Sequence, residues 1–236
     1  AFIGSRAVTL YTIKEEILFG LKLLSKTQSE EIDIHSLRMG VSKEQPLLQS
    51  ILNKGLSSLT YEEKTELAEK WVGHTSDENN KNEDLNINLS QQEKTFLKQH
   101  PIIRVHNEMS WAPYNFNIDG KPQGYSVDMM KLIADKLGIQ IRFVNGPSWN
   151  EFLGMLQTKK IDVISNMAIT PEREKYTTYT QLPMIQHFPS IVTTTKNAYK
   201  HIGDLNGKTV AVVEGFWYQE AFQNGKLKLA NNLAFE

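Results

Sequence analysis

Up to residue 73 the hydrophobic pattern is mostly helical. Apolar residues recur at helical spacing in three segments, and one short apolar run favours a strand. Thr60 precedes the third helical segment and Glu63 follows three residues later, which is the spacing of a capping box. The predicted helices are 7–24, 46–59 and 61–71, and the predicted strand is 37–41.

A polar segment interrupts this pattern. Residues 74–92 read HTSDENNKNEDLNINLSQQ, rich in Asn, Asp, Glu and Ser and poor in large apolar side chains. Such composition is typical of a linker between folded parts. We therefore place a domain boundary here and take 74–95 as the linker.

Beyond the linker, predicted strands and helices alternate. Ser126 is a candidate N-cap, and Gly138 is placed to end the helix that follows it. The predicted strands are 102–105, 139–144, 161–164, 190–194 and 209–213. The predicted helices are 126–137, 149–157 and one that opens at Gly215. This alternation predicts an α/β fold with a parallel sheet and helices on both faces.

Ligands of such sheets bind outside the carboxyl ends of the strands. Five residues fall at that predicted edge: Glu108, Trp111, Trp149, Asn166 and Arg173. The two tryptophans could wall a ligand, although large aromatic side chains more often fill a core. Glu108 could receive an ammonium group, although a lone acid is more often solvated, and Asn166 offers neutral hydrogen bonds.

The stretch ISNMAITPER at 164–173 predicts a strand that turns into a helix. Thr170 is a good N-cap, and Pro171 suits the first helical position. Arg173 then falls in the first turn, where the backbone already favours an anion. A guanidinium there could clamp a carboxylate. A solvated Arg173, or one paired with a nearby acid, is equally compatible with the residues. The candidate acids are Glu172, Glu174 and Glu236.

Composition narrows the function classes. The net charge of −1 gives no reason to expect nucleic acid as a partner, and no apolar run reaches the roughly 20 residues that span a bilayer. There is no cysteine, the six histidines show no metal-ligand spacing, and no nucleophile, phosphate-loop or dinucleotide motif appears. We expect no cofactor and no metal.

Four segments together resemble the type II periplasmic solute-binding proteins, or Venus flytraps, of the polar amino-acid kind. They read IIRVHNEMSWAPYNF, DGKPQGYSVDMMKLIADKLG, IRFV…WNEFLGMLQTKKIDVISNMAITPERE and DLNGKTVAVVEG. The resemblance implies that Arg173 clamps a ligand α-carboxylate beside Thr170. It also implies that Trp111 and Trp149 line the ligand and that Glu108 is the acid of the first loop. We also include Asn166 and Met167 among the candidate residues that line the ligand.

Residues 1–73 are similar to the closing part of another flytrap, through AFIGSRAVTLYTIKE and LRMGVSKEQPLLQSILNKGLSSLTYEEKTELAEKWVG. The fold expected is periplasmic binding protein-like II, with parts of two bilobed flytraps. The expected domains are 1–73, the C-terminal part of the first flytrap; 74–95, the linker; 96–188, the first lobe of the second; and 189–236, the start of its second lobe. Tandem flytraps of this kind resemble the sensor region of hybrid histidine kinases of the virulence-regulator type.

The chain departs from the family pattern after Gly215. Ser or Thr residues that often bind ligand there are replaced by Phe216 and Trp217, and Ala168 replaces a hydroxyl common after the strand. These changes suggest a larger or less polar ligand, or none. We keep Gly215, Phe216 and Trp217 as candidate ligand residues.

The leading expectation is a sensory binding module and not an enzyme. It would be the periplasmic portion of an inner-membrane protein, with a homodimer in the full-length receptor and the membrane reached only by segments outside this chain. A small amino acid or organic acid would bind between the lobes. Three alternatives stay open: a solute-binding subunit of an ABC transporter, a cyclohexadienyl dehydratase-like enzyme that uses Glu108, and an empty scaffold with Phe216 and Trp217 in the cleft.

Overall fold

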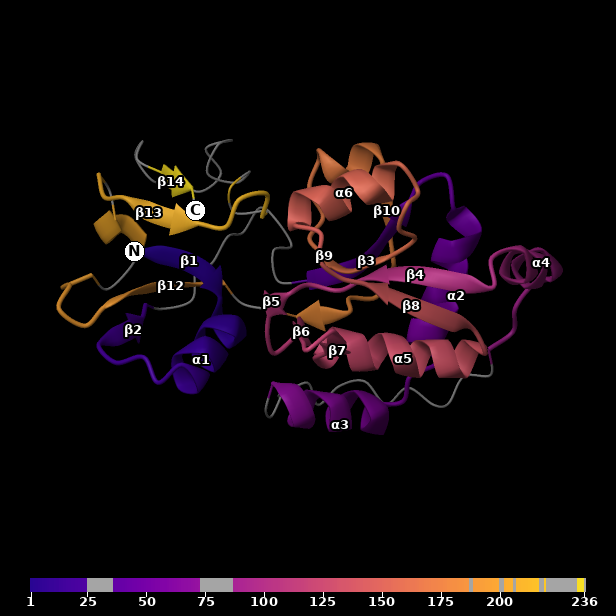
Figure 1. The fold of residues 1–236 in the computed structure, drawn as a ribbon, viewed down its shortest axis with the longest axis horizontal. Coiled ribbons are helices and arrows are strands. Elements are labelled where there is room, and N and C mark those ends of the chain that lie inside the picture. The colour runs from indigo at the N-terminus through magenta and orange to yellow at the C-terminus, as the bar shows by residue number, and fades with distance from the viewer. Residues whose placement is uncertain are drawn as a thin grey trace. The chain divides into compact units, whose positions relative to one another are not determined.

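The computed structural model divides into two compact units (Figure 1). Unit 1 joins residues 1–36 with 186–236, and unit 2 comprises 37–185. Each unit therefore contains segments from both sides of the predicted linker. The structure describes residues 1–24, 36–72, 87–186, 189–199, 202–205, 207–216, 219 and 233–235.

Unit 1 is built around a five-stranded mixed sheet. Its elements are β1 (Phe2–Ser5), α1 (Arg6–Glu15), β2 (Leu21–Leu23), β12 (Pro189–Thr194), η2 (Ile202–Leu205), β13 (Val210–Val212) and β14 (Leu233–Phe235). The strand order is β14-β13-β1-β12-β2. In Figure 1 the indigo strand β1 lies between β13 and β12; it is parallel to β13 and antiparallel to β12. The two ends of the sequence thus form one sheet.

The first predicted helix is shorter than expected. Helix α1 ends at Glu15, whereas periodicity predicted a helix to residue 24. Ile17 and Gly20 adopt positive φ angles of 50° and 75°, which an α-helix does not accommodate. Residues 21–23 instead pair with β12 as a strand. The apolar residues after Glu15 therefore belong partly to a sheet.

Unit 2 contains the remaining elements, except that the first residue of β3 and the last residue of β11 fall in unit 1. They are β3 (Ser36–Ser42), α2 (Pro46–Ser57), α3 (Tyr61–Trp71), α4 (Gln91–Gln99), β4 (Ile102–His106), β5 (Ser110–Trp111), β6 (Asn115–Ile118), β7 (Lys121–Gln123), α5 (Tyr125–Leu137), β8 (Gln140–Val144), α6 (Trp149–Gln157), β9 (Ile164–Met167), η1 (Arg173–Lys175), β10 (Thr177–Tyr179) and β11 (Ile185–Gln186). The predictions for 46–59, 61–71 and 149–157 are confirmed, and both bonds of the Thr60 capping box form.

Two boundaries in unit 2 differ from prediction. Helix α5 begins one residue earlier than predicted and has Gly124 as its N-cap, so Ser126 lies inside the helix. Ser126 is also fully buried. Gly124 has a φ of 114°, and a Cβ there would lie 2.5 Å from the Tyr114 carbonyl oxygen, so a glycine is needed. Helix α4 was not predicted, since its polar sequence was assigned to the linker. The reciprocal bonds between Ser90 and Glu93 begin it.

Unit 2 contains three sheets with both parallel and antiparallel strand pairs, so the predicted parallel sheet is found only in part. Strands β4 and β8 are parallel, and Val105 forms a parallel bridge to Val163 just before β9. Strand β3, from the N-terminal segment, runs antiparallel to both β9 and β10. The strand predicted at 161–164 lies further along the chain, because β9 spans Ile164–Met167; it pairs with β3 across a register shift between Arg38 and Gly40.

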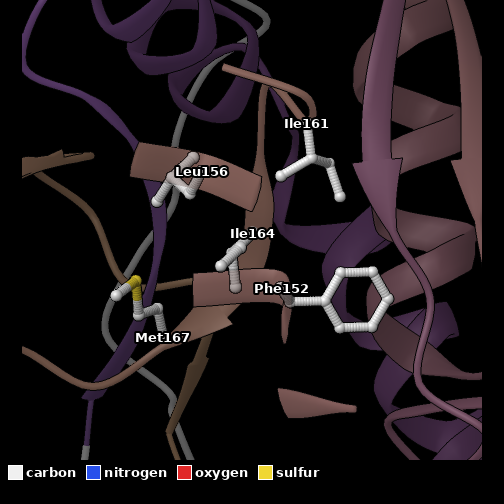
Figure 2. Packing of buried hydrophobic residues seen from close by; sticks show 5 residues of the cluster. All are labelled: Phe152, Leu156, Ile161, Ile164 and Met167. Atoms are coloured by element: carbon white, nitrogen blue, oxygen red, sulfur yellow. The ribbon is translucent and has the colours of Figure 1, made fainter. Parts of the chain in front are cut away.

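The apolar side of β9 packs under helix α6. Figure 2 shows Phe152 and Leu156 of the helix with Ile161, Ile164 and Met167, and all five side chains are fully buried. Burying an aliphatic or aromatic side chain of this size stabilises the fold by about 1.5–3 kcal/mol. This cluster fixes the strand on which the candidate site is built.

Strand β3 pairs with both β9 and β10, the strands before and after the turn at 168–176. Opposite β9, Gly40 leaves no room for a side chain, since a Cβ there would lie 2.7 Å from the Met167 sulfur and 3.0 Å from Cγ2 of Thr177. Met167 is the last residue of β9, and Thr177 is the first of β10. Gly40 therefore sets how closely these strands approach.

We expect Gly40→Ala to lower the free energy of unfolding by about 1–3 kcal/mol, because the added methyl group overpacks the space beside Met167. Gly154→Ala is the matched control. Gly154 is interior to α6 with open space around its Cβ position, so alanine should stabilise that helix by up to about 1 kcal/mol. Urea unfolding of both variants measures the difference. Equal stabilities of the two variants would contradict the packing described for Gly40.

Candidate functional site

Arg173 lies in a tight turn between β9 and β10. The Arg173 N–H donates to Oγ1 of Thr170 at 3.4 Å, and the Glu174 N–H donates to the Thr170 carbonyl at 2.9 Å. Only the three-residue 3-10 helix η1 follows, because the chain enters β10 at Thr177. The predicted α-helix N-terminus is therefore corrected to a capped turn, and the argument from an aligned helix dipole does not apply.

The Arg173 side chain is buried within this turn, at 2% exposure. Its Nη1 donates to the Ala168 carbonyl at 3.0 Å, and its Cζ lies 5.4 Å from the centroid of the Trp149 ring. The alternative of a solvated Arg173 is therefore wrong. Glu172, one of the three candidate acids, instead pairs with Lys175 at 2.6 Å, while Glu236 lies outside the described residues. A buried guanidinium beside an aromatic ring suits recognition of a planar anion.

Trp149 joins Arg173 to the end of β4. It is the first residue of α6, which begins with a capping box between Ser148 and Glu151. Its half-buried ring meets the His106 ring edge-on, with centroids 6.1 Å apart. Since α6 also packs on β9, a single helix positions an aromatic surface beside the guanidinium.

A buried polar network lies at the ends of β4 and β9. His106, Asn107, Asn115, Ser165 and Asn166 are all at most 5% exposed. Asn115 accepts from Nδ2 of Asn107 at 2.7 Å and donates to Oδ1 of Asn166 at 3.1 Å. Ser165 donates its backbone N–H to Nδ1 of His106 at 3.1 Å. Buried hydrogen-bond networks of this kind hold side chains in one arrangement.

His106 and Glu108 are close but do not form an ion pair. Burial lowers the pKa of His106 to about 3 and raises the pKa of Glu108 to about 7, and Nε2 lies 3.7 Å from Oε1. Between these pKa values both groups are neutral. The Glu108 side chain is 14% exposed, so the alternative of a solvated acid is wrong. Near neutral pH it can offer either a proton or a carboxylate to a ligand.

Trp111 lies in strand β5, whereas it was expected in a loop. Its half-buried ring packs against Tyr114, with centroids 4.9 Å apart, and its backbone pairs with Asn115. The structure thus places Trp111 beside the polar network through its main chain. Whether its ring meets a ligand stays a prediction.

The structure brings most of the predicted site residues to one region of unit 2. Contacts link Arg173, Thr170 and Trp149, and hydrogen bonds through Asn115 link Asn166 with the Glu108 main chain. Met167 is buried in the cluster of Figure 2. Gly215 and Phe216 belong to unit 1, and Trp217 lies outside the described residues. A ligand-binding role for any of these residues stays a prediction.

Sequence reasoning missed His106, Asn107 and Asn115 as parts of this site. His106 and Asn107 directly follow the apolar run of β4, and both are fully buried. A polar pair continuing a buried strand is the signal that could have revealed them, because such groups are kept only when hydrogen-bonded. Asn115 carries no such local signal.

Among the described residues, no helix is both long enough and apolar enough to cross a bilayer. The described residues also contain no group of three or more histidine or acidic side chains that is arranged to hold a metal ion.

A family model described as "Bacterial extracellular solute-binding proteins, family 3" matches residues 103–234, which is over half of the chain. The chain therefore belongs to this family. The mixed α/β architecture in two units agrees with the fold class expected from the sequence.

Individual relatives match over shorter stretches. The chain is 32% identical over 104 residues to the probable amino-acid-binding protein YxeM of Bacillus subtilis, covering 44% of this chain and 39% of that protein. It is 28% identical over 124 residues to the histidine-binding periplasmic protein of Salmonella typhimurium, covering 52% and 47%. The chain thus spans about half the length or less of these two curated relatives.

Among solved structures, one similar chain is described as an ancestral amino acid-binding protein, AncCDT-1, a precursor of cyclohexadienyl dehydratase. It has a TM-score of 0.49 and 24% identity, and the match covers 60% of this chain and 64% of that chain.

The burial of Glu108 predicts a pH-dependent stability. Its pKa is about 7 in the folded protein against an ordinary value of 4.5, so the folded state binds the proton more tightly. Stability is therefore lost as the pH rises through this window. Glu108→Gln should remove that loss, so its stability relative to wild type should increase by about 3 kcal/mol between pH 4.5 and pH 8.

Urea unfolding at several pH values measures this difference. Glu66→Gln, an exposed acid of α3, is the control and should follow the wild-type pH dependence. A Glu108→Gln stability that stays parallel to wild type over the whole range would contradict the burial described for Glu108.

Proposed function

We propose that this chain binds a small carboxylate-bearing solute of the amino-acid class at the end of β9, with Arg173 as the carboxylate-binding residue. The observation that carries the proposal is the buried guanidinium of Arg173 beside the Trp149 ring. A guanidinium can bind a carboxylate through two parallel hydrogen bonds, which are stronger than neutral ones because both groups are charged.

Family membership supports the class of ligand. Relatives are named for binding histidine, arginine and L-cystine, all of which carry an α-carboxylate and an α-ammonium group. Arg173 suits the carboxylate, and Glu108 suits an ammonium group or a polar side chain when it is ionised. Trp149 offers a flat face to the apolar part of such a solute.

We further propose that the binding module belongs to a sensor histidine kinase, in a full-length protein anchored in the inner membrane with this part in the periplasm. The support is the order of segments: 1–73 resemble the end of a flytrap, and 102–209 resemble the start of another. A ligand would bias the kinase only by its different affinity for two conformations.

An ABC-transporter binding subunit is the second candidate, since some relatives are named as such proteins. The chain beyond this sequence distinguishes the two. A membrane span followed by a kinase core supports sensing, and a full-length protein without either supports transport.

A dehydratase-like activity is favoured by one observation, the carboxyl group of Glu108 with its pKa near 7, which suits a general acid or base. We favour binding over catalysis because the named relatives are binding proteins. Incubation with prephenate or arogenate should give no turnover. Turnover abolished in Glu108→Gln would establish the enzyme instead.

The central test is a thermal-shift panel of L-amino acids and small organic acids. A solute present at about 100 times its dissociation constant should stabilise the wild-type protein by roughly 2.7 kcal/mol. Arg173→Ala should abolish this shift, and Arg173→Lys should leave a smaller one, because lysine keeps the charge without the bidentate geometry.

Arg142→Ala is the matched control, since Arg142 is an exposed arginine of β8, and it should keep the full shift. The thermal shift of each variant is the difference between its own melting temperatures with and without solute. A change in the stability of the variant alone therefore does not alter the comparison. A full shift in Arg173→Ala would mean that the carboxylate binds elsewhere. No shift in wild type with any solute would favour an empty scaffold.

A further inference from the structure

Asn115 connects three elements of unit 2 through one side chain. It is fully buried at the start of β6. Its Oδ1 accepts from Nδ2 of Asn107 at 2.7 Å and from the backbone N–H of Glu108 at 3.1 Å. Its Nδ2 donates to Oδ1 of Asn166 at 3.1 Å. The loop after β4, strand β6 and strand β9 thus meet at this amide.

The backbone N–H of Glu108 settles which way the Asn115 amide faces. A backbone N–H can only donate, so the atom that receives it must be the oxygen of Asn115. The nitrogen of Asn115 is then the atom that faces Asn166. Because an amide nitrogen can only donate, the atom of Asn166 that it meets must be Oδ1.

His106 supports the same assignment. Its Nδ1 accepts the Ser165 backbone N–H at 3.1 Å, so the proton of the neutral ring is on Nε2. Nε2 lies 3.4 Å from Nδ2 of Asn115 and, being protonated, cannot accept from it. Asn115 therefore directs its donor to Asn166 rather than to the imidazole.

Asn166 is left with its amide nitrogen available. Its Oδ1 also accepts from Oγ of Ser165 at 2.9 Å, so the oxygen is held by two donors. Its Nδ2 has no hydrogen-bond partner among the described residues. It is also not one of the fully buried side-chain atoms in that part of the chain that lack a partner. The residue keeps 5% exposure. The side chain thus presents N–H donors and no free acceptor.

We propose that Asn115 is a positioning residue that fixes Asn166 as a hydrogen-bond donor for an acceptor oxygen of the bound solute. This rests on the proposed function, in which the solute carries a carboxylate. Asn166 would then select for carboxylate or carbonyl oxygens at this position and against ammonium or amide N–H groups. Asn115 touches no solute and acts through Asn166.

The orientation of the amides can be tested without any solute. In the wild-type chain, the side-chain NH₂ protons of Asn166 should exchange with water faster than those of Asn115, which are buried and bonded. Water-exchange NMR of assigned side-chain amide signals measures both rates. Asn166 protons that exchange as slowly as those of Asn115 would overturn the proposal, whether or not a solute binds.

The positioning role is tested by calorimetric titration with L-histidine in a double-mutant cycle. Asn166→Ala should weaken binding about tenfold, the effect of one lost hydrogen bond to a charged group. Asn115→Ala should weaken it similarly in the wild-type background and less than about twofold in the Asn166→Ala background, because its effect passes through Asn166. Effects of Asn115→Ala that are equal in both backgrounds would overturn the positioning role.

Asn117→Ala is the matched control. Asn117 is on the same strand and donates to Asn107 at 2.8 Å without touching Asn166, so affinity should stay within about twofold. A loss as large as that of Asn115→Ala would show general damage to the network and contradict the specific role. If wild type does not bind L-histidine, the same cycle is run with L-arginine. Failure of both amino acids would count against the proposed function, and the exchange rates would still decide the orientation of Asn166.

Discussion

The antiparallel pairing of β3 with β9 and β10 is the constraint on which the rest of unit 2 depends. A strand from the N-terminal segment contacts both strands that flank the turn of Arg173. Backbone pairing alone would permit small slips, but Gly40 lies against Met167 and Thr177 with no space to spare. The position of the turn is therefore set by residues more than 120 positions earlier in the chain.

The candidate site beside these strands contains buried charged and polar side chains, each in contact with residues that reduce the cost of burying it. The carbonyl of Ala168 and the ring of Trp149 contact the guanidinium of Arg173, and hydrogen bonds join five polar side chains around His106 and Asn115. Buried polar groups without partners would cost about 1–3 kcal/mol each, so the network has strong reason to adopt one arrangement. Such preorganisation lowers the entropic cost of binding a small solute.

Local patterns predicted much of this fold. The helices beginning at Pro46, Tyr61 and Trp149 follow from periodicity and caps, because their signals lie within a few residues of each other. Helix α1 was predicted too long, since an apolar run does not show where φ becomes positive at Ile17. The antiparallel pairing of β3 with β9 and β10 could not be predicted, because pairing between distant segments leaves no local pattern in the sequence.

The candidate site shows the same division between local and distant information. Arg173, Thr170 and Asn166 became candidates because they lie together in one stretch, and the resemblance to solute-binding proteins gave them their expected roles. The Thr170 hydroxyl accepts the Arg173 N–H, but the predicted α-helix is only the three-residue 3-10 helix η1 with Glu172 as its N-cap, since β10 begins too soon. Asn115 was missed because its importance comes from three partners on other elements, and none of them is its neighbour in the sequence.

The most direct test of the central claim is calorimetric titration of the chain with L-histidine and L-arginine, each compared with its α-amide. The amides keep the side chain and the α-ammonium group but lose the carboxylate charge. If Arg173 binds a carboxylate, the tighter-binding acid should exceed its amide by at least about tenfold, as expected for a hydrogen bond to a charged group. Equal affinities of acid and amide would show that no carboxylate is recognised and would contradict the role given to Arg173.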